Sequence, residues 1–182
     1  AVDPASLVNA ILDGNLDGLR TLRAVVRSRA TEHILEALSS RPTLELRQLD
    51  IEVSQHHLHE QDNMEERAIV RINAPRLTNL RLKHAGPRVL AWLTQSVDGL
   101  LHLQSIQLLT PLVPLEHMIN FLKTLPPSVR ELRLGNVDSR ALEAWRPTAV
   151  QSLHLAGVKI NHQALGSLLD KTAAALTSLR LR

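Results

Sequence analysis

The chain has 182 residues, of which 44% are hydrophobic, and its formal net charge is +3. This length and apolar content suffice for one domain with a sizeable buried core. Because there is no cysteine, disulfides, cysteine-ligated zinc and a thiol nucleophile are excluded. No apolar run approaches the ~20 residues of a membrane-spanning helix, and residues 1–4 lack the basic start of a signal peptide. We therefore expect a cytoplasmic or nuclear protein with no membrane partner.

One six-residue pattern recurs along the chain: an apolar residue, two variable residues, an apolar residue, one variable residue and an apolar residue. A poor copy opens the series at Leu19-Arg20-Thr21-Leu22-Arg23-Ala24, and Leu77-Thr78-Asn79-Leu80-Arg81-Leu82 is a full copy. The seven copies begin at residues 19, 46, 77, 103, 129, 150 and 176, so that three of the spacings are 26 residues. Unrelated strands would not share this spacing by chance. The pattern predicts seven short strands, centred on Leu22, Leu49, Leu80, Ile106, Leu132, Leu153 and Leu179.

Helical stripes occupy segments between these strands, because apolar residues there recur three and four positions apart. The first stripe, at 7–12, predicts a short opening helix that covers the first strand. Pro87 and Pro114 stand where two helices would begin, which suits the fixed φ angle of proline, and Asn161 is a candidate N-cap. The later stripes lie at 89–97, 115–122 and 165–169, and the segment 139–145 has room for about two helical turns.

The repeated pattern resembles that of the leucine-rich-repeat family over about residues 4–182. The resemblance implies an α/β solenoid, with a curved parallel sheet on the concave side and helices on the convex side. The 26-residue spacing is similar to the helix-bearing repeats of intracellular members. We therefore expect one leucine-rich-repeat domain over 1–182, with about seven repeats. Because the chain stops at Arg182, directly after a strand, we expect a missing C-terminal cap, further repeats, or a partner that covers this end.

Two sequence features, Asn136 and the segment 72–75, indicate which kind of leucine-rich repeat the chain resembles. Members of the family usually carry an Asn or Cys after the strand, where a ladder of Asn side chains bonds the convex turns, and Asn136 is the nearest match here. Ile72-Asn73-Ala74-Pro75, before the copy at Leu77, resembles repeats of F-box proteins, which present substrates to ubiquitin ligases. No F-box precedes it in this chain, and a bacterial effector built from the same repeats would look similar.

The variable positions of the pattern should form the concave face, because successive side chains of a strand point to opposite sides. Seven of the 17 Arg residues lie there, where even scatter would place about two, and only Asp50 and Glu131 are acidic. Neighbouring strands lie ~4.8 Å apart, so these side chains should form a continuous basic stripe. Arginine suits bidentate recognition of carboxylate or phosphate, although a solvated strand face is the other interpretation. The candidate partner-binding residues are Arg20, Arg23, Arg47, Arg81, Arg130, Arg133, His154 and Arg180.

Within this stripe, Arg81, Arg133 and Arg180 occupy one slot of three repeats, and Gln107 and His154 occupy the same slot in the repeats between. Side chains in one slot project in one direction and should form a row across the concave face. We expect that the chain does not neutralise these guanidinium groups itself and that a ligand supplies the compensating anions.

One insertion, at 54–67, carries three His residues and several carboxylates, which could together ligate a metal. Their spacing matches no zinc pattern, and a solvated loop that contacts a partner is the other interpretation. The sequence contains no GxGxxG, GxxxxGK[ST] or GxSxG motif, and nothing places Ser, His and Asp together. We therefore predict no catalytic residues, no metal, no cofactor and no small-molecule substrate.

The sequence favours a protein-interaction module that binds an acidic or polar protein partner through its Arg-rich concave face, as an adaptor or substrate-recognition domain. An alternative is nucleic-acid binding, with the phosphate backbone along the same stripe. The scarcity of aromatic residues argues against stacking of single strands. A repeat-built scaffold for an enzyme, such as a GTPase activator, is a third hypothesis, for which no motif supplies a site.

Overall fold

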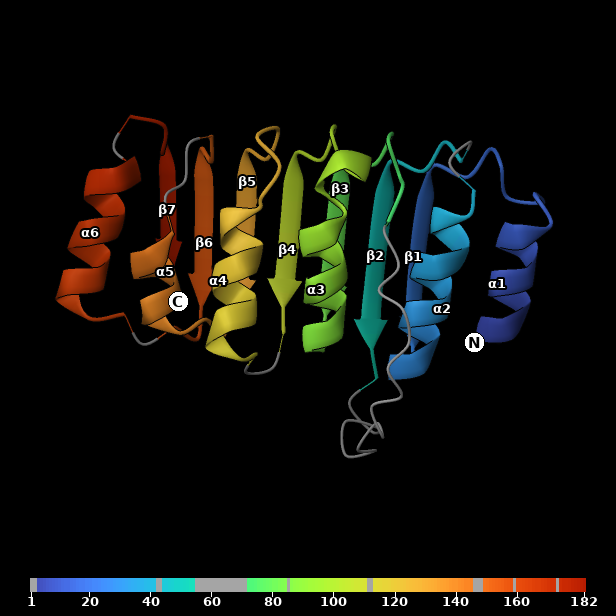
Figure 1. Cartoon of the computed structure of the whole chain (residues 1–182), viewed down its shortest axis with the longest axis horizontal. Helices are drawn as coiled ribbons and strands as arrows, with labels where there is room; N and C mark the ends of the chain where they lie inside the picture. The colour runs from blue at the N-terminus through green and yellow to red at the C-terminus, as the bar shows by residue number, and fades with distance from the viewer. Residues whose placement is uncertain are drawn as a thin grey trace.

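The computed structural model describes residues 3–41, 44–54, 72–84, 86–110, 113–145, 149–158, 160–172 and 174–182. In these residues the fold is α/β, with a seven-stranded parallel sheet whose strand order follows the chain order. Helices alternate with the strands and lie on one face of the sheet (Figure 1). The opposite face, which we call the open face, has no helix of the described chain over it. The result is an extended, solenoid-like α/β layer pair.

The strands form where the repeated pattern predicts them. Each is short, because only the alternating segment presents one apolar face to the helices. The prediction of seven parallel strands is confirmed, and the central Leu or Ile of each copy aligns with that of the next strand. The strands are β1 (Thr21–Val26), β2 (Gln48–Val53), β3 (Asn79–Lys83), β4 (Ser105–Leu109), β5 (Glu131–Gly135), β6 (Ser152–Ala156) and β7 (Ser178–Leu181).

Helices form where the apolar stripes predict them, but some of these helices begin or end at other residues than predicted. The stripe at 89–97 is divided, because the helix ends at Gln95 and a short 3₁₀ turn follows at Val97–Gly99. Pro87 begins its helix as expected, whereas Pro114 is the N-cap residue of the next one. Asn161 caps the last helix, since its Oδ1 accepts from the amide of Ala164 at 2.6 Å. The helices are α1 (Pro4–Leu12), α2 (Ser28–Ser39), α3 (Pro87–Gln95), α4 (Leu115–Lys123), α5 (Ser139–Ala144) and α6 (His162–Thr172).

The opening helix α1 occupies a different place from the expected one. It packs mainly against α2, which the sequence analysis did not single out, and extends the helical layer beside β1 (Figure 1). The connection from β1 to β2 already supplies α2 over this part of the sheet, so α1 takes the next position outward. Ile11 of α1 is fully buried and joins the common core.

The core is one continuous stack of aliphatic layers between the sheet and the helices. The side chains predicted to be inaccessible are so, with exposed fractions of 3% for Leu80, 1% for Ile106, 0% for Leu132 and 1% for Leu153. The neighbouring residues of the same strands point to the open face and are partly or fully exposed. The inside and outside assignment of the pattern is therefore confirmed for the central strands. At β7 the apolar face is less covered, and Leu181 is 48% exposed.

Asn136 occupies the turn that follows β5. Its φ angle is +54°, in the left-handed region that Asn tolerates better than most residues. Its side-chain Nδ2 donates to the carbonyl of Thr110 in the preceding repeat, at 3.2 Å. The backbone amide of Asn136 donates in turn to the carbonyl of Ala156 in the following repeat. This one Asn therefore ties three successive repeats together at the end of their strands.

Replacing Asn136 with Ala is expected to lower the free energy of unfolding by ~1–2 kcal/mol, because the side-chain hydrogen bond is lost and Ala disfavours a positive φ angle. Asn136→Gly loses the same hydrogen bond but accepts the backbone angle, so its loss should be smaller. Urea denaturation of both variants measures the two contributions. Equal stability of the Ala variant and the parent protein would show that neither feature matters for the fold.

Candidate partner-binding face

The open face is built from three rows of side chains that run across the strands. The central row contains five of the eight sequence-predicted site residues, brought together by the register of the sheet. From β1 to β7 this central row is Arg23, Asp50, Arg81, Gln107, Arg133, His154 and Arg180. The first row, two residues earlier in each strand, is Thr21, Gln48, Asn79, Ser105, Glu131, Ser152 and Ser178. The third row, two residues later, is Val25, Glu52, Lys83, Leu109, Gly135 and Ala156, which Arg182 continues directly after β7.

The other three predicted residues, Arg20, Arg47 and Arg130, do not join the central row. Each precedes the first residue of its strand and lies at the edge where the strands begin. The guanidinium group of Arg130 donates to two backbone carbonyls, those of Pro127 at 2.9 Å and Ala149 at 3.2 Å. Arg130 therefore bridges adjacent turns. Arg47 and Arg20 are both exposed, and Nε of Arg20 lies 4.0 Å from a carboxylate oxygen of Glu45.

One carboxylate, that of Asp50, interrupts the central row, contrary to the expectation that the chain does not neutralise this row. Asp50 lies between two arginines, 4.0 Å from Nε of Arg23 and 3.2 Å from Nη1 of Arg81. The side chain of Asp50 is only 15% exposed, so its charge is held against the sheet by these partners. The first three strands thus carry an Arg–Asp–Arg cluster with a net charge of one instead of two free cations.

The third row contains a second internal pair. Lys83 donates to Glu52 on the neighbouring strand. This hydrogen bond, aided by the positive charges of Lys83, His84 and Arg81, lowers the pKa of the Glu52 carboxyl below its ordinary value. The repeated pattern carries no signal for this pair, because β2 continues two residues and β3 one residue beyond it. Extending the alternation by one step would have found it.

On β5, Glu131 of the first row pairs with Arg133 of the central row. The closest approach is 2.7 Å, and Ser105 of β4 donates to the other oxygen of Glu131. Because both Glu131 and Arg133 are partly solvated, we expect their pairing to contribute little to stability. It does, however, orient the guanidinium group toward its neighbour on the same strand.

His154 of β6 sits between Arg133 and Arg180 in the central row. Its Nε2 atom is buried and has no hydrogen-bond partner among the described residues. Desolvation lowers the pKa of the imidazole below its ordinary value, and the charges of Arg182, Arg133 and Arg180 lower it further. Glu131 opposes the effect but does not outweigh it. The imidazole is therefore neutral at neutral pH and surrounded by cations.

This environment predicts a pH-dependent stability. The unfolded chain binds a proton at the ordinary imidazole pKa, whereas folded His154 binds it only at lower pH. The free energy of unfolding is therefore independent of His154 when the pH lies above the ordinary imidazole pKa. It falls as the pH decreases from that value toward the lower pKa of His154 in the folded protein. His154→Gln should reduce this loss of stability at acidic pH. Thermal unfolding of both proteins between about pH 7.5 and pH 5 tests the effect, and parallel curves would contradict it.

A hollow of about 340 Å³ lies on the open face between the two charged ends. Its floor is polar, with Asn79, Ser105 and Gln107 in the centre and the ion-paired residues around them. Gln107 makes no side-chain hydrogen bond within the described part of the chain, so its amide is available to a ligand. The hollow could accept side chains of a partner that lies across the strands.

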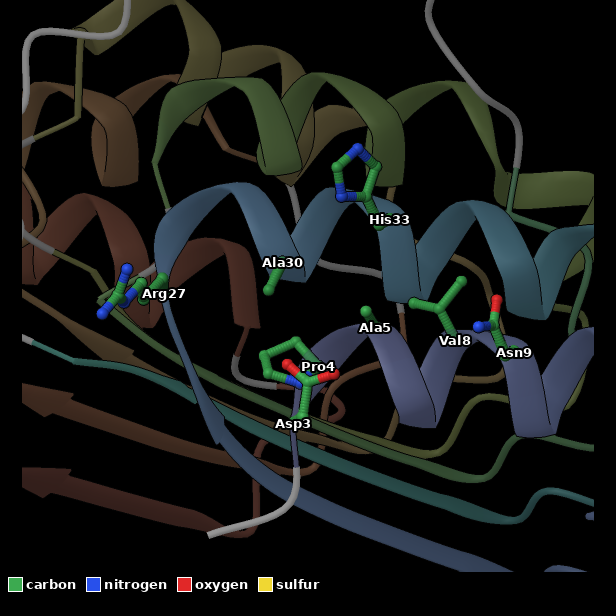
Figure 2. A pocket seen from close by; sticks show the side chains of 8 residues that line it. All are labelled: Asp3, Pro4, Ala5, Val8, Asn9, Arg27, Ala30 and His33. Atoms are coloured by element: carbon green, nitrogen blue, oxygen red, sulfur yellow. The ribbon is translucent and has the colours of Figure 1, made fainter.

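A larger hollow, of about 730 Å³, lies between α1 and α2 (Figure 2). Its polar groups do not converge on one point. His33 points away from α1, and Arg27 lies at the start of α2 (Figure 2). The carboxylate of Asp3 already accepts from the amide and the hydroxyl of Ser6 as the N-cap of α1. This hollow is therefore a less suitable candidate than the open face.

The candidate metal ligands of the insertion lie at 55–67, outside the described residues, and both interpretations of this segment stay predictions. None of the described helices combines the length and the apolar character needed to cross a bilayer. Comparison of the chain with protein-family models and with curated proteins finds no match.

Proposed function

We propose that the chain is a leucine-rich-repeat domain that acts as a protein-interaction module and binds a polar, partly acidic protein segment across its open face. The supporting features are the repeated apolar pattern, the parallel sheet with helices on one side, and the uncovered opposite face. A binding surface of this kind needs no cofactor, and the role that fits it is that of an adaptor or substrate-recognition domain.

The pattern of charge on the open face is the observation that carries this proposal. Cations and carboxylates alternate across β1 to β3, while cations predominate across β5 to β7. A protein segment can place charges of both signs to match this pattern, with its acidic part over the later strands. Between the two ends, the polar hollow offers amide and hydroxyl groups for hydrogen bonds.

The same charges make nucleic acid a poorer ligand. A phosphate backbone laid along the rows would carry negative charge at every step and would meet Asp50, Glu52 and Glu131. The pairing of Asp50 with two arginines removes much of the cationic character that the sequence alone indicated. We therefore favour a protein ligand over a phosphate backbone.

Selection of a random peptide library on the immobilised protein tests the proposal, with peptides of about 12 residues, long enough to cross several strands. We expect the selected peptides to be enriched in Asp and Glu and to bind with only a moderate dependence on salt. A filter-binding titration with generic duplex DNA is the comparison. Tight DNA binding that falls steeply with salt, and no enriched peptides, would contradict the proposal.

A further inference from the structure

Some charged side chains of the open face are paired with an oppositely charged side chain, and others are not. Between β1 and β3, Arg23 and Arg81 share Asp50, and Lys83 is paired with Glu52. At β7 and directly after it, the guanidinium groups of Arg180 and Arg182 make no hydrogen bond or ion pair within the described part of the chain. Among the described residues, the guanidinium groups of the three rows that have no side-chain partner are therefore those of Arg180 and Arg182, and we call this part of the face the uncompensated end.

His154 lies at the centre of this uncompensated end. Its direct neighbours in the register are Arg133 on one side and Arg180 on the other. The backbone of Arg182 continues the pairing beyond β7, since its amide donates to the carbonyl of Leu155 at 3.0 Å and its carbonyl accepts from Gly157. Three guanidinium groups thus surround an imidazole whose buried Nε2 has no partner.

Most residues beside this cluster are apolar or uncharged. In the third row, Leu109, Gly135 and Ala156 give β4 to β6 an apolar strip next to Arg133 and His154. The side chain of Leu109 packs over Gly135, which is buried, and Ala156 is partly exposed beside them. Apolar surroundings strengthen charge interactions made next to them. In the first row, Ser152 and Ser178 are uncharged, so Glu131 is the one carboxylate near His154 on these strands.

We propose that Arg133, His154, Arg180 and Arg182 form a subsite for an Asp or Glu side chain of the protein partner, and that filling this subsite adds a proton to His154. This inference rests on the proposed function and specifies where the acidic part of the ligand binds. The carboxylate accepts hydrogen bonds from the guanidinium groups, and its negative charge lies beside the imidazole of His154. The adjacent apolar strip accommodates an uncharged neighbouring residue of the same ligand.

The proton uptake follows from the change in charge around the imidazole. In the free protein, desolvation and three nearby cations hold the pKa of His154 below its ordinary value. A bound carboxylate offsets the charge of these cations and attracts the protonated ring, so the pKa rises on binding. A ligand that raises the pKa of His154 binds more tightly as the pH falls through the range between the pKa of the free protein and that of the complex. The groups that face the imidazole are Glu131 and Arg133 of β5, Arg180 of β7, and Arg182.

An NMR titration of the histidine side chains tests the proposal, with a tetraglutamate peptide as the probe. We expect the peptide to raise the measured pKa of His154 by about half a pH unit or more and to leave the exposed His102 unchanged. For a rise of half a pH unit, binding should be about 1.5- to 3-fold tighter at about pH 5.5 than at about pH 7.5. His154→Gln should abolish this gain, and then the protonation of the peptide's own carboxylates should make binding weaker at the lower pH.

Two variants locate the subsite. Arg180→Gln should weaken binding of tetraglutamate several-fold, whereas Arg140→Gln, at an exposed position of α5, should change it less than about twofold. Thermal unfolding confirms that each variant is folded before its affinity is compared. A phosphoserine peptide or inorganic phosphate that binds more tightly than tetraglutamate would overturn the assignment of a carboxylate.

The inference is also overturned if tetraglutamate leaves the titration of His154 unchanged, or if Arg140→Gln weakens binding as much as Arg180→Gln. This failure is distinct from failure of the proposed function. Library-selected peptides that bind over β1 to β4 would support a protein-binding open face and would still reject the His154 subsite.

Discussion

Leu132→Ala is expected to lower the free energy of unfolding by ~2–5 kcal/mol, the range found for other fully buried Leu side chains. Leu132 is 0% exposed and lies in the middle of β5, between Ile106 of β4 and Leu153 of β6 in the register. Truncation removes apolar contacts and leaves a cavity that rigid neighbouring strands cannot close. Since each repeat buries its apolar face against its neighbours, the loss should affect both adjacent layers.

The adjacent residue supplies the matched control. Arg133 of the same strand points to the open face, where its side chain is 46% exposed and pairs with Glu131. Arg133→Ala should therefore cost less than ~1 kcal/mol. Chemical denaturation of both variants gives the two values. Equal losses would show that the inside and outside faces of the repeated pattern have been assigned wrongly.

Charge reversal at two positions of the central row is expected to weaken binding of library-selected acidic peptides by well over tenfold. In the double variant Arg81→Glu, Arg133→Glu, two cations that face the ligand become carboxylates, which repel an acidic segment. The change at 81 also removes a partner of Asp50, and the change at 133 removes the partner of Glu131. The loss of affinity then comes from uncompensated negative charge on the open face as well as from lost contacts.

A charge reversal on the helical side provides the control for this experiment. Lys123 and Arg140 are exposed residues of α4 and α5 and lie in the layer opposite the open face. The double variant Lys123→Glu, Arg140→Glu changes the net charge by the same amount, so it should alter binding less than about twofold. Both proteins are compared at equal folded fraction, measured by thermal unfolding. Similar losses in the two double variants would mean that net charge, and not the open face, governs the affinity.

The strands could be predicted from the sequence because burial repeats with a fixed period. The spacing of Leu80, Ile106 and Leu132 places each in the same layer, and no other arrangement buries all copies at once. Helix ends were less predictable. Val97 continues the apolar stripe of α3, yet the chain leaves the α-helix after Gln95, where Ser96 accepts from the amide of Ile72 and donates to the carbonyl of Trp92. Such local hydrogen bonds compete with the helix and leave no periodic signal.

The sequence predicted which residues of the candidate site share one row, but the ion pairs between these residues and their neighbours were not predicted. The alignment of repeats already places Arg23, Asp50 and Arg81 in one slot, so their pairing could have been found by reading the slot from the first copy onward. The third row was missed because backbone pairing continues past the last apolar residue of the pattern. The contact of Arg130 with carbonyl groups depends on a side-chain conformation, and the sequence carries no signal for it.

The central claim is that the open face of the sheet is the binding surface. Backbone amide NMR of the protein with a library-selected acidic peptide tests this most directly, because it locates the ligand without any substitution. We expect the largest shift changes in β4 to β7, at residues 105–109, 131–135, 152–156 and 178–181, with little change in α3 to α6. Shift changes confined to the helices, or to the hollow between α1 and α2, would contradict the account.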